Sequence, residues 1–152
     1  MMTKLLTVLA AFGVLASASN SAVPATGTTA KAAPEPRQIA DNAMKFVAAE
    51  DLKGLFEFIG RNMPMEPDEL KKIRDNIVDQ RKKIPGALGK PMGFTFVSEC
   101  RRSEILVRLL YAEKREKNVM RWEFIFYRPR NVWTMVSFHW DSNVQGLFAP
   151  CN

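Results

Sequence analysis

The stretch NVMRWEFIFYRPRNVWTMVSFHWD, residues 118–141, decides the fold because aromatic and charged side chains alternate along it. Glu123, for example, separates Trp122 from Phe124. Side chains two residues apart lie on the same face of a β-strand, so the alternation predicts strands with one apolar and one charged face. The run RPRN, residues 128–131, interrupts the alternation and predicts a turn. We therefore expect two antiparallel strands here.

The same period of two begins near residue 92 and predicts a sheet of four strands. We expect these strands at Met92–Cys100, Ser103–Glu113, Asn118–Arg128 and Val132–Asp141. Because the links between them are short, strands that are neighbours in the sequence are expected to pair antiparallel. The run VQGLF, residues 144–148, is a candidate for a fifth, short edge strand.

The turn lengths predict which residues face each other across the sheet. They pair Ser98 with Ile105, Leu109 with Trp122, and Trp122 with His139. One face then collects the apolar side chains of Phe94, Phe96, Ile105, Val107, Leu109, Trp122, Phe124, Phe126, Trp133 and Met135. The other face collects Thr95, Val97, Glu99, Arg108, Arg121, Glu123, Ile125, Tyr127, Val136 and Phe138. We expect the apolar face to pack under helices, and a one-residue slip would exchange the two faces.

Helical spacing of apolar residues precedes the sheet. Residues 38–60 show this spacing, and Asp51 is placed to cap a second helix within them. A third helix is expected to start at Pro67, a favoured first-turn residue, and to end at Pro85-Gly86. Its inward side chains are expected to be Leu70, Ile73, Ile77 and Ile84. The fold class predicted is thus α+β, with three N-terminal helices on a curved antiparallel sheet of four or five strands.

The first 18 residues have the features of a signal peptide. Lys4 precedes the apolar run Leu5–Leu15, and small residues follow it. Cleavage is expected after residue 18, with Ala22 and Ala25 as alternative positions. The competing interpretation is a buried first helix. The apolar run is about half of the roughly 20 residues that span a bilayer, so no membrane anchor is expected.

Residues 19–37 are small, polar and proline-containing, and we expect a flexible linker there. Residues 38–152 are then enough for a single domain with its own core. Export to the periplasm or the outside of the cell is the predicted localisation. The formal net charge of +6 is mildly basic, which favours an anionic partner without indicating a fold.

Cys100 and Cys151 are the two cysteines of the chain. In an oxidising compartment such a pair is expected to form a disulfide. Two buried thiols, or a bridge between two chains, are the alternatives. With one histidine besides, the chain offers few metal ligands, so we expect no metal and no cofactor. Basic residues are mixed with acidic ones, so nucleic acid is not an expected partner.

The element order and two sequence runs, FVAAEDLKGLFEFI (residues 46–59) and RWEFIFYRPRNVWTMVSFHWD (residues 121–141), resemble the nuclear transport factor two-like superfamily. That resemblance implies a cone-shaped domain in which helices cover the concave face of the sheet. The superfamily includes isomerases, dehydratases, cyclases and hydrolases, and also members that only bind ligands or dimerise. The resemblance therefore does not select a function.

Three polar residues form the candidate catalytic group. The predicted register brings Tyr111, His139 and Asp141 together at one end of the apolar face. A carboxylate beside a histidine can orient it and tune its pKa for acid–base chemistry. The rest of the mapped apolar face offers no acid or base. The alternative is that Tyr111 and His139 satisfy hydrogen bonds at the rim, while Asp141 ends its strand.

Four arginines form a candidate anion site at the opposite end of the sheet. Two predicted turns bring Arg101, Arg102, Arg128 and Arg130 close together. Guanidinium groups bind phosphate and carboxylate bidentately, so anionic lipid headgroups, a cell-wall polymer or an acidic protein are candidate partners. A solvated basic rim is the alternative.

The charged face of the sheet is the third candidate. Arg108 is expected directly opposite Glu123 within an apolar frame formed by Val97, Leu106, Ile125, Val136 and Phe138. Opposite charges across strands stabilise a sheet without any further function. A half-apolar exposed face also marks partner surfaces, so a homodimer through the sheet is the functional alternative.

We therefore expect an exported, non-catalytic domain that binds an apolar or amphipathic ligand inside the cone, or a protein partner on the sheet. The ligand-binding side chains expected inside the cone are Phe94, Phe96, Trp122, Phe124 and Trp133. The alternative is a small acid–base enzyme, of the isomerase, dehydratase or hydrolase type, acting on an apolar substrate through Tyr111, His139 and Asp141.

Overall fold

The structure is a computed structural model that describes residues 33–151. Four helices come first: α1 (Pro36–Ala48), α2 (Leu52–Asn62), α3 (Pro67–Arg81) and α4 (Ile84–Leu88). Four strands and a 3₁₀ helix follow: β1 (Pro91–Arg102), β2 (Leu106–Arg115), β3 (Val119–Tyr127), β4 (Thr134–Asp141) and η1 (Val144–Phe148). The strands form one antiparallel sheet in the order β1-β2-β3-β4. The predicted α+β class with a four-stranded antiparallel sheet is confirmed.

The predicted signal peptide and most of the predicted linker lie outside the described residues. The linker was expected to extend to Arg37, but α1 begins at Pro36, so that boundary is wrong by two residues. A proline is favoured in the first helical turn because its missing N–H would have no partner there. Among residues 33–151, no helix combines the length and apolarity needed to cross a bilayer.

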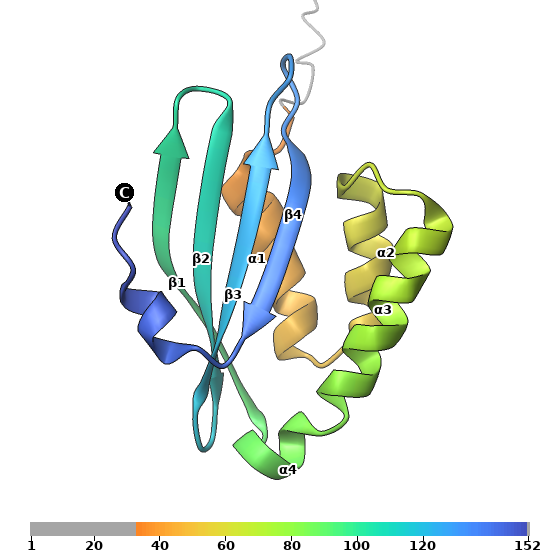
Figure 1. The fold of residues 1–152 in the computed structure, drawn as a ribbon, viewed down its shortest axis with the longest axis vertical. Helices are drawn as coiled ribbons and strands as arrows, with labels where there is room; N and C mark the ends of the chain where they lie inside the picture. The colour runs from red at the N-terminus through yellow and green to blue at the C-terminus, as the bar shows by residue number, and fades with distance from the viewer. Residues whose placement is uncertain (1–32, 152) are drawn as a thin grey trace, which may run out of the picture. The chain divides into compact units, whose positions relative to one another are not determined.

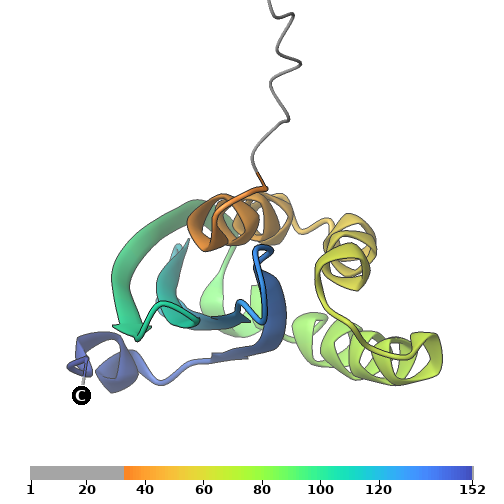
Figure 2. The same cartoon turned by 90° about the horizontal axis from the view of Figure 1, so that it is seen from above.

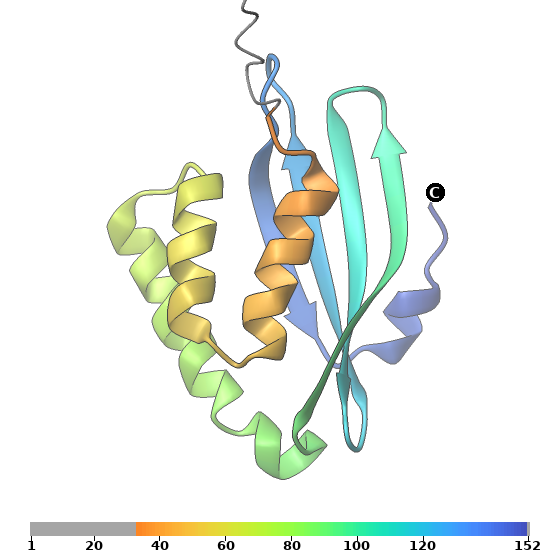
Figure 3. The ribbon, with the colours of Figure 1, turned by 180° about the vertical axis from the view of Figure 1, so that it is seen from behind.

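The sheet is strongly bent, and α1 lies across its hollow side (Figures 1 and 2). Seen from behind, α1 runs in front of the strands, while α2 and α3 lie beyond the edge strand β4 (Figure 3). α1 packs on α2, β1 and β2, whereas α3 packs mainly on α2 and α4. One helix thus covers the inner face, and the other long helices extend the domain sideways.

Local signals explain where the helices begin and end. The Asp51 side chain accepts a hydrogen bond from the Gly54 backbone N–H at 2.8 Å, which confirms the predicted cap of α2. α3 starts at Pro67 as predicted but ends at Arg81. Pro85 and Gly86 lie inside the short helix α4, so the predicted end of α3 at these two residues is wrong. Proline is favoured there because the first turn of a helix leaves its N–H groups without partners.

The predicted apolar face is the inner face that packs under α1. Of its predicted members, seven are buried in one core cluster with α1 and α2: Val107, Leu109, Trp122, Phe124, Phe126, Trp133 and Met135. Phe94 and Phe96 are partly buried against that cluster. Ile105 was also expected there but is 47% exposed in the β1–β2 turn, because β2 starts only at Leu106.

All three predicted cross-strand pairs are wrong in detail. Ser98 faces Leu110, and Leu109 faces Phe124. The β2–β3 register differs from the prediction by two residues, which keeps every side chain on its expected face because the period is two. The inner faces of β2 and β3 are therefore as predicted, whereas Ser98 faces a residue five positions beyond the predicted Ile105.

A β-bulge in the β3–β4 pair does change faces. Ile125 pairs with Ser137 and Phe126 with Met135, so Val136 is an extra residue. Trp122 consequently faces Trp140 rather than the predicted His139. Phe138 and Trp140 therefore pack against the core, and Phe138 is not on the outer face where it was expected. A second irregularity, between Phe96 and Ser98, brings Glu99 opposite the inward Leu109, which corrects the expected outer position of Glu99.

The C-terminal residues 142–151, here called the C-terminal strap, cross the outer face of the sheet. The predicted edge strand VQGLF is instead the 3₁₀ helix η1, which lies against β2 and β3 (Figure 1). Beyond η1, Arg108 donates a hydrogen bond to the Pro150 carbonyl at 3.4 Å. The strap therefore covers part of the face that the sequence offered to a second copy of the chain.

The strap ends at a disulfide between Cys100 on β1 and Cys151, whose Cα atoms are 5.5 Å apart. The predicted pairing is therefore seen within one chain. The bridge joins residues separated by 51 positions, so it restricts a long loop of the unfolded chain.

Replacing both cysteines by serine, as Cys100→Ser/Cys151→Ser, is expected to lower the free energy of unfolding by about 4 kcal/mol, through the greater entropy of the unfolded chain. Urea unfolding of the wild type and the double variant measures this loss. A reductant should destabilise the wild type alone. Equal stability of both proteins in the absence of reductant would contradict the prediction.

Candidate functional site

A buried carboxylate, Glu113, lies on the inner face at the end of β2. It accepts hydrogen bonds from Arg81 at 2.7 and 3.0 Å, from Arg115 at 2.7 Å and from the Trp122 indole N–H at 2.8 Å. Arg115 also donates to Glu50, in the link between α1 and α2, at 2.7 Å. The Glu113 side chain is fully buried, so these donors replace its hydration.

The environment of Glu113 keeps it charged. Burial alone would raise its pKa, but hydrogen bonds from Arg81, Trp122 and Arg115 outweigh burial and hold the pKa below its ordinary value of 4.5. A carboxylate with its acceptor sites filled in this way is a structural group. The expectation that the rest of the inner face offers no acid is wrong. The period of two in β2, which aligns Glu113 with Leu109, was the signal that could have revealed it.

The variant Glu113→Gln is expected to lose about 3 kcal/mol of stability at neutral pH, because the buried Arg81 loses its ion-pair partner and Arg115 keeps only Glu50. The depressed pKa of Glu113 stabilises the fold above the ordinary glutamate pKa, and this contribution is lost as the pH falls through the folded-state value. The difference in unfolding free energy between wild type and variant should therefore shrink below pH 4.5. Urea unfolding across acidic and neutral pH measures it, and a pH-independent difference would contradict the account.

Tyr111 is buried in the core rather than at a polar rim. Its hydroxyl donates to Asp41 Oδ1 at 2.7 Å, and Arg37 donates to the same oxygen at 2.9 Å. Both partners belong to α1, so this hydrogen bond ties the covering helix to β2. Burial and the Asp41 carboxylate raise the pKa of Tyr111 far above its ordinary value of 10.0. The phenol is thus held protonated as a donor to Asp41.

His139 and Asp141 lie on the outer face of β4. The Nε2 atom of His139 is 2.9 Å from Asp141 Oδ2, and Arg121 contacts the same carboxylate. Burial raises the pKa of Asp141, but hydrogen bonds from Arg121, the Asn143 backbone N–H and His139 outweigh it, and the pKa lies below its ordinary value of 3.8. The predicted convergence with Tyr111 is wrong, because the bulge at Val136 turns His139 away from the inner face.

The variant Tyr111→Phe is expected to destabilise the fold by about 1–2 kcal/mol, because Asp41 loses a hydrogen-bond donor in a partly buried position. Tyr127→Phe is the matched control, since Tyr127 is 39% exposed at the end of β3 and should change stability little. Thermal and urea unfolding of both variants measure the difference. Equal stability of the two variants would show that the Tyr111 hydroxyl contributes nothing to the fold.

The aromatic residues expected to bind a ligand are packed against one another. Trp122 stacks with Phe124 at 6.1 Å and with Trp140 at 5.9 Å between ring centres. Phe96 is partly buried and is covered by the Arg37 guanidinium, 3.6 Å from its ring centre. Trp122 and Phe124 have no exposed surface, so they form the core beneath α1.

Two of the four predicted arginines meet at one indole. The guanidinium carbons of Arg101 and Arg128 lie 5.9 and 4.8 Å from the centre of the buried Trp133 ring. Arg102 and Arg130 are exposed in or beside the same two turns. On the outer face, the predicted pair of Arg108 and Glu123 is present at 3.9 Å, although the register makes the two residues diagonal rather than directly opposite.

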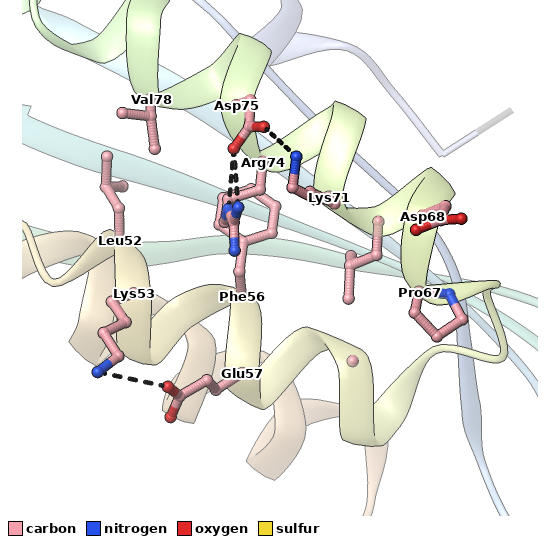
Figure 4. Close-up of a pocket in the computed structure, with 12 residues that line it drawn as sticks. Leu52, Lys53, Phe56, Glu57, Pro67, Asp68, Lys71, Arg74, Asp75 and Val78 are labelled. Carbon is pink, nitrogen blue, oxygen red and sulfur yellow. Dashed lines mark hydrogen bonds and ion pairs between the residues drawn. The ribbon is translucent and has the colours of Figure 1, made fainter.

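A groove of about 740 Å³ lies between α2 and α3 (Figure 4). We call it the α2–α3 groove. It is lined by Leu52, Lys53, Phe56, Glu57, Gly60, Pro67, Asp68, Leu70, Lys71, Arg74, Asp75 and Val78. The predicted inward stripe of α3, which includes Leu70 and Ile77, did not indicate the groove. Val78, which follows Ile77 and widens that stripe, was the available signal.

Five of the six charged side chains of the groove take part in ion pairs along its rim, and Asp68 takes part in none within the described residues 33–151. Lys53 lies 4.0 Å from Glu57 along α2. On α3, Asp75 is paired with Lys71 at 3.4 Å and with Arg74 at 2.9 Å (Figure 4). The hydrogen bond from Arg74 holds the pKa of Asp75 below its ordinary value of 3.8. Three basic and three acidic side chains line the groove, so its formal charge is zero.

A smaller pocket of about 390 Å³ lies between α3 and β4. Its lining residues are Met63, Ile73, Asn76, Ile77, Gln80, Val136, Ser137, Phe138, His139 and Trp140. Of the three residues proposed for acid–base chemistry, His139 alone belongs to this wall. Within residues 33–151, no cluster of three His, Cys, Asp or Glu side chains is arranged to hold a metal ion.

No protein-family model, curated protein or solved structure matches this chain. The resemblance to the nuclear transport factor two-like superfamily therefore stays a prediction, carried by element order and the two quoted runs. The function has to be argued from the geometry of the chain itself.

Proposed function

We propose that this protein is an exported, non-catalytic binding module whose ligand site is the α2–α3 groove. The observation that carries the proposal is the groove itself: about 740 Å³ between two helices, with an apolar floor and a charged rim. Pockets of roughly 300–1,000 Å³ with such linings are typical of small-molecule sites. The proposed ligand is a small, uncharged and largely apolar molecule.

The floor of the groove supports an apolar ligand. α2 contributes Leu52 and Phe56, and α3 contributes Leu70 and Val78 (Figure 4). Leu70 and Val78 are only half-buried, so water is in contact with apolar surface that a ligand would cover. Burying such surface is favourable by about 25 cal/mol per Å², which is the driving force proposed for binding.

The rim supports an uncharged ligand. Because three basic and three acidic side chains line the groove, the rim leaves no net charge for an ionic ligand to neutralise. Lys53 and Lys71 are long and exposed, so they can fold over a bound molecule with their methylene groups while their charges stay in water.

Two features support a binding role over catalysis. The buried acid Glu113 has its acceptor sites filled by Arg81, Arg115 and Trp122, and it is not among the residues that line the groove. The lining residues include no histidine, cysteine, serine or tyrosine.

For export, the Cys100–Cys151 disulfide adds support to the signal peptide predicted at residues 1–18, since disulfides persist in oxidising compartments.

The variant Gly60→Phe tests the groove by filling it. A Cβ atom at Gly60 would meet the end of the Leu70 side chain at 2.9 Å, so a larger side chain enters the space between the helices. Arg61→Phe, which adds the same ring at the next, exposed position of α2, is the control. The wild type is expected to bind the neutral probe N-phenyl-1-naphthylamine saturably, measured by its fluorescence.

Gly60→Phe should weaken binding of this probe at least tenfold while Arg61→Phe leaves it unchanged, because about 1.5–3 kcal/mol of burial is lost with one large apolar contact. Native mass spectrometry of protein from its own host reports any copurified ligand in the same preparations. Equal probe binding by all three proteins would reject the groove as the site.

A further inference from the structure

The β1–β2 turn (103–105) and the β3–β4 turn (128–133) lie side by side at one end of the sheet (Figure 1). A backbone hydrogen bond of 2.9 Å from Arg128 N to the Ile105 carbonyl joins the two turns. We call this the turn end of the sheet. It lies apart from the α2–α3 groove, since none of its residues lines that groove.

The turn end carries an excess of positive charge. It holds the four arginines Arg101, Arg102, Arg128 and Arg130, against two acidic residues, Glu99 and Glu104. Glu99 pairs with Arg101. None of the other three arginines forms an ion pair with a residue of the described range 33–151. The charge that would balance these guanidinium groups is therefore not supplied by the part of the chain that the structure describes.

A rigid ring holds two of the guanidinium groups. Trp133 is only 5% exposed, and both Arg101 and Arg128 lie within cation–π distance of its ring. Arg102 and Arg130 are exposed to solvent in or beside the same two turns. This arrangement combines two ring-supported and two solvent-exposed donors for anionic oxygen atoms, and guanidinium groups bind phosphate bidentately.

The turn end also exposes apolar side chains. Eight large hydrophobic residues are exposed within residues 33–151, and four of them are here: Ile105 at 47%, Leu106 at 37%, Tyr127 at 39% and Val132 at 57%. Leu106 faces Tyr127 across β2 and β3, and Ile105 and Val132 project from the two turns. A soluble anion would be bound by the arginines without any use of these side chains.

We infer that the turn end docks on a membrane surface that contains anionic phospholipid. The arginines contact lipid phosphates, while Ile105 and Val132 enter the boundary between headgroups and acyl chains. Basic residues and apolar side chains on one surface are the combination that binds proteins to anionic bilayers, with the two contributions adding. This inference does not depend on the groove being a ligand site.

The test is flotation of the chain, as its host produces it, with vesicles of phosphatidylcholine that do or do not contain phosphatidylglycerol. The wild type should bind the anionic vesicles more tightly, and added salt should weaken this binding. Arg102→Gln/Arg130→Gln should weaken binding roughly 30-fold, the factor expected for two arginines at such a surface. Neither arginine bonds to a described side chain, so the variant should keep its thermal unfolding temperature.

The matched control is Lys72→Gln/Lys83→Gln, which removes the same charge from exposed positions outside the turn end. It should bind as the wild type does, whereas Ile105→Ser/Val132→Ser should bind more weakly with its salt dependence unchanged. Equal weakening by the control would overturn the inference, as would equal binding to both vesicle types. Full displacement by inorganic phosphate would also overturn it, since the turn end would then be a site for a free anion.

Discussion

The buried charge of Glu113 is the constraint on which the rest of the structure depends. Its carboxylate joins the last residue of α3, the end of β2 and the indole of β3, and Arg115 extends the network to Glu50 between α1 and α2. A carboxylate can be buried only where donors replace its water, and here those donors come from three separate elements. The hydrogen bonds from Arg81 to Glu113 therefore fix the position of α3 on the sheet, and apolar packing alone would leave it freer to shift.

That constraint explains why the domain has both a filled interior and an open groove. α1 lies over the inner face and is held there by its apolar side and by the Asp41–Tyr111 hydrogen bond. α3 is anchored to the sheet at its C-terminal end, through Arg81, while the rest of the helix packs on α2. A helix fixed at one end and lying beside the sheet, rather than on it, leaves apolar surface between α2 and α3 uncovered. The α2–α3 groove is the consequence.

Two of the bulges in the sheet decide on which face the candidate site residues lie. The extra residue at Val136 turns Trp140 into the core and His139 outward, which separates His139 from Tyr111. The bulge at Val136 thus separates the residues of the candidate acid–base group. The irregularity between Phe96 and Ser98 places Arg101 beside the Trp133 indole, where Arg128 also lies. Because alternate residues of a strand face opposite sides, the extra residue of a bulge moves every residue beyond it to the other face.

The sequence by itself determined the helix starts at Asp51 and Pro67, the four strands, the cysteine pair and the apolar face centred on Trp122 and Phe124. Capping, proline geometry and period-two alternation are local effects, so they can be recognised in the chain alone. The two-residue error in the β2–β3 pairing did not disturb the faces of these two strands, which is why their core residues were predicted better than their register.

Only the tertiary structure decided the bulges, the path of the C-terminal strap, the partners of Glu113 and the existence of the groove. Each depends on contacts between residues far apart in the chain: Arg81 meets Glu113, and Arg108 meets Pro150. The local sequence carries no signal for such a pair. The interaction between the two residues stabilises the fold only after packing has removed water from both of them.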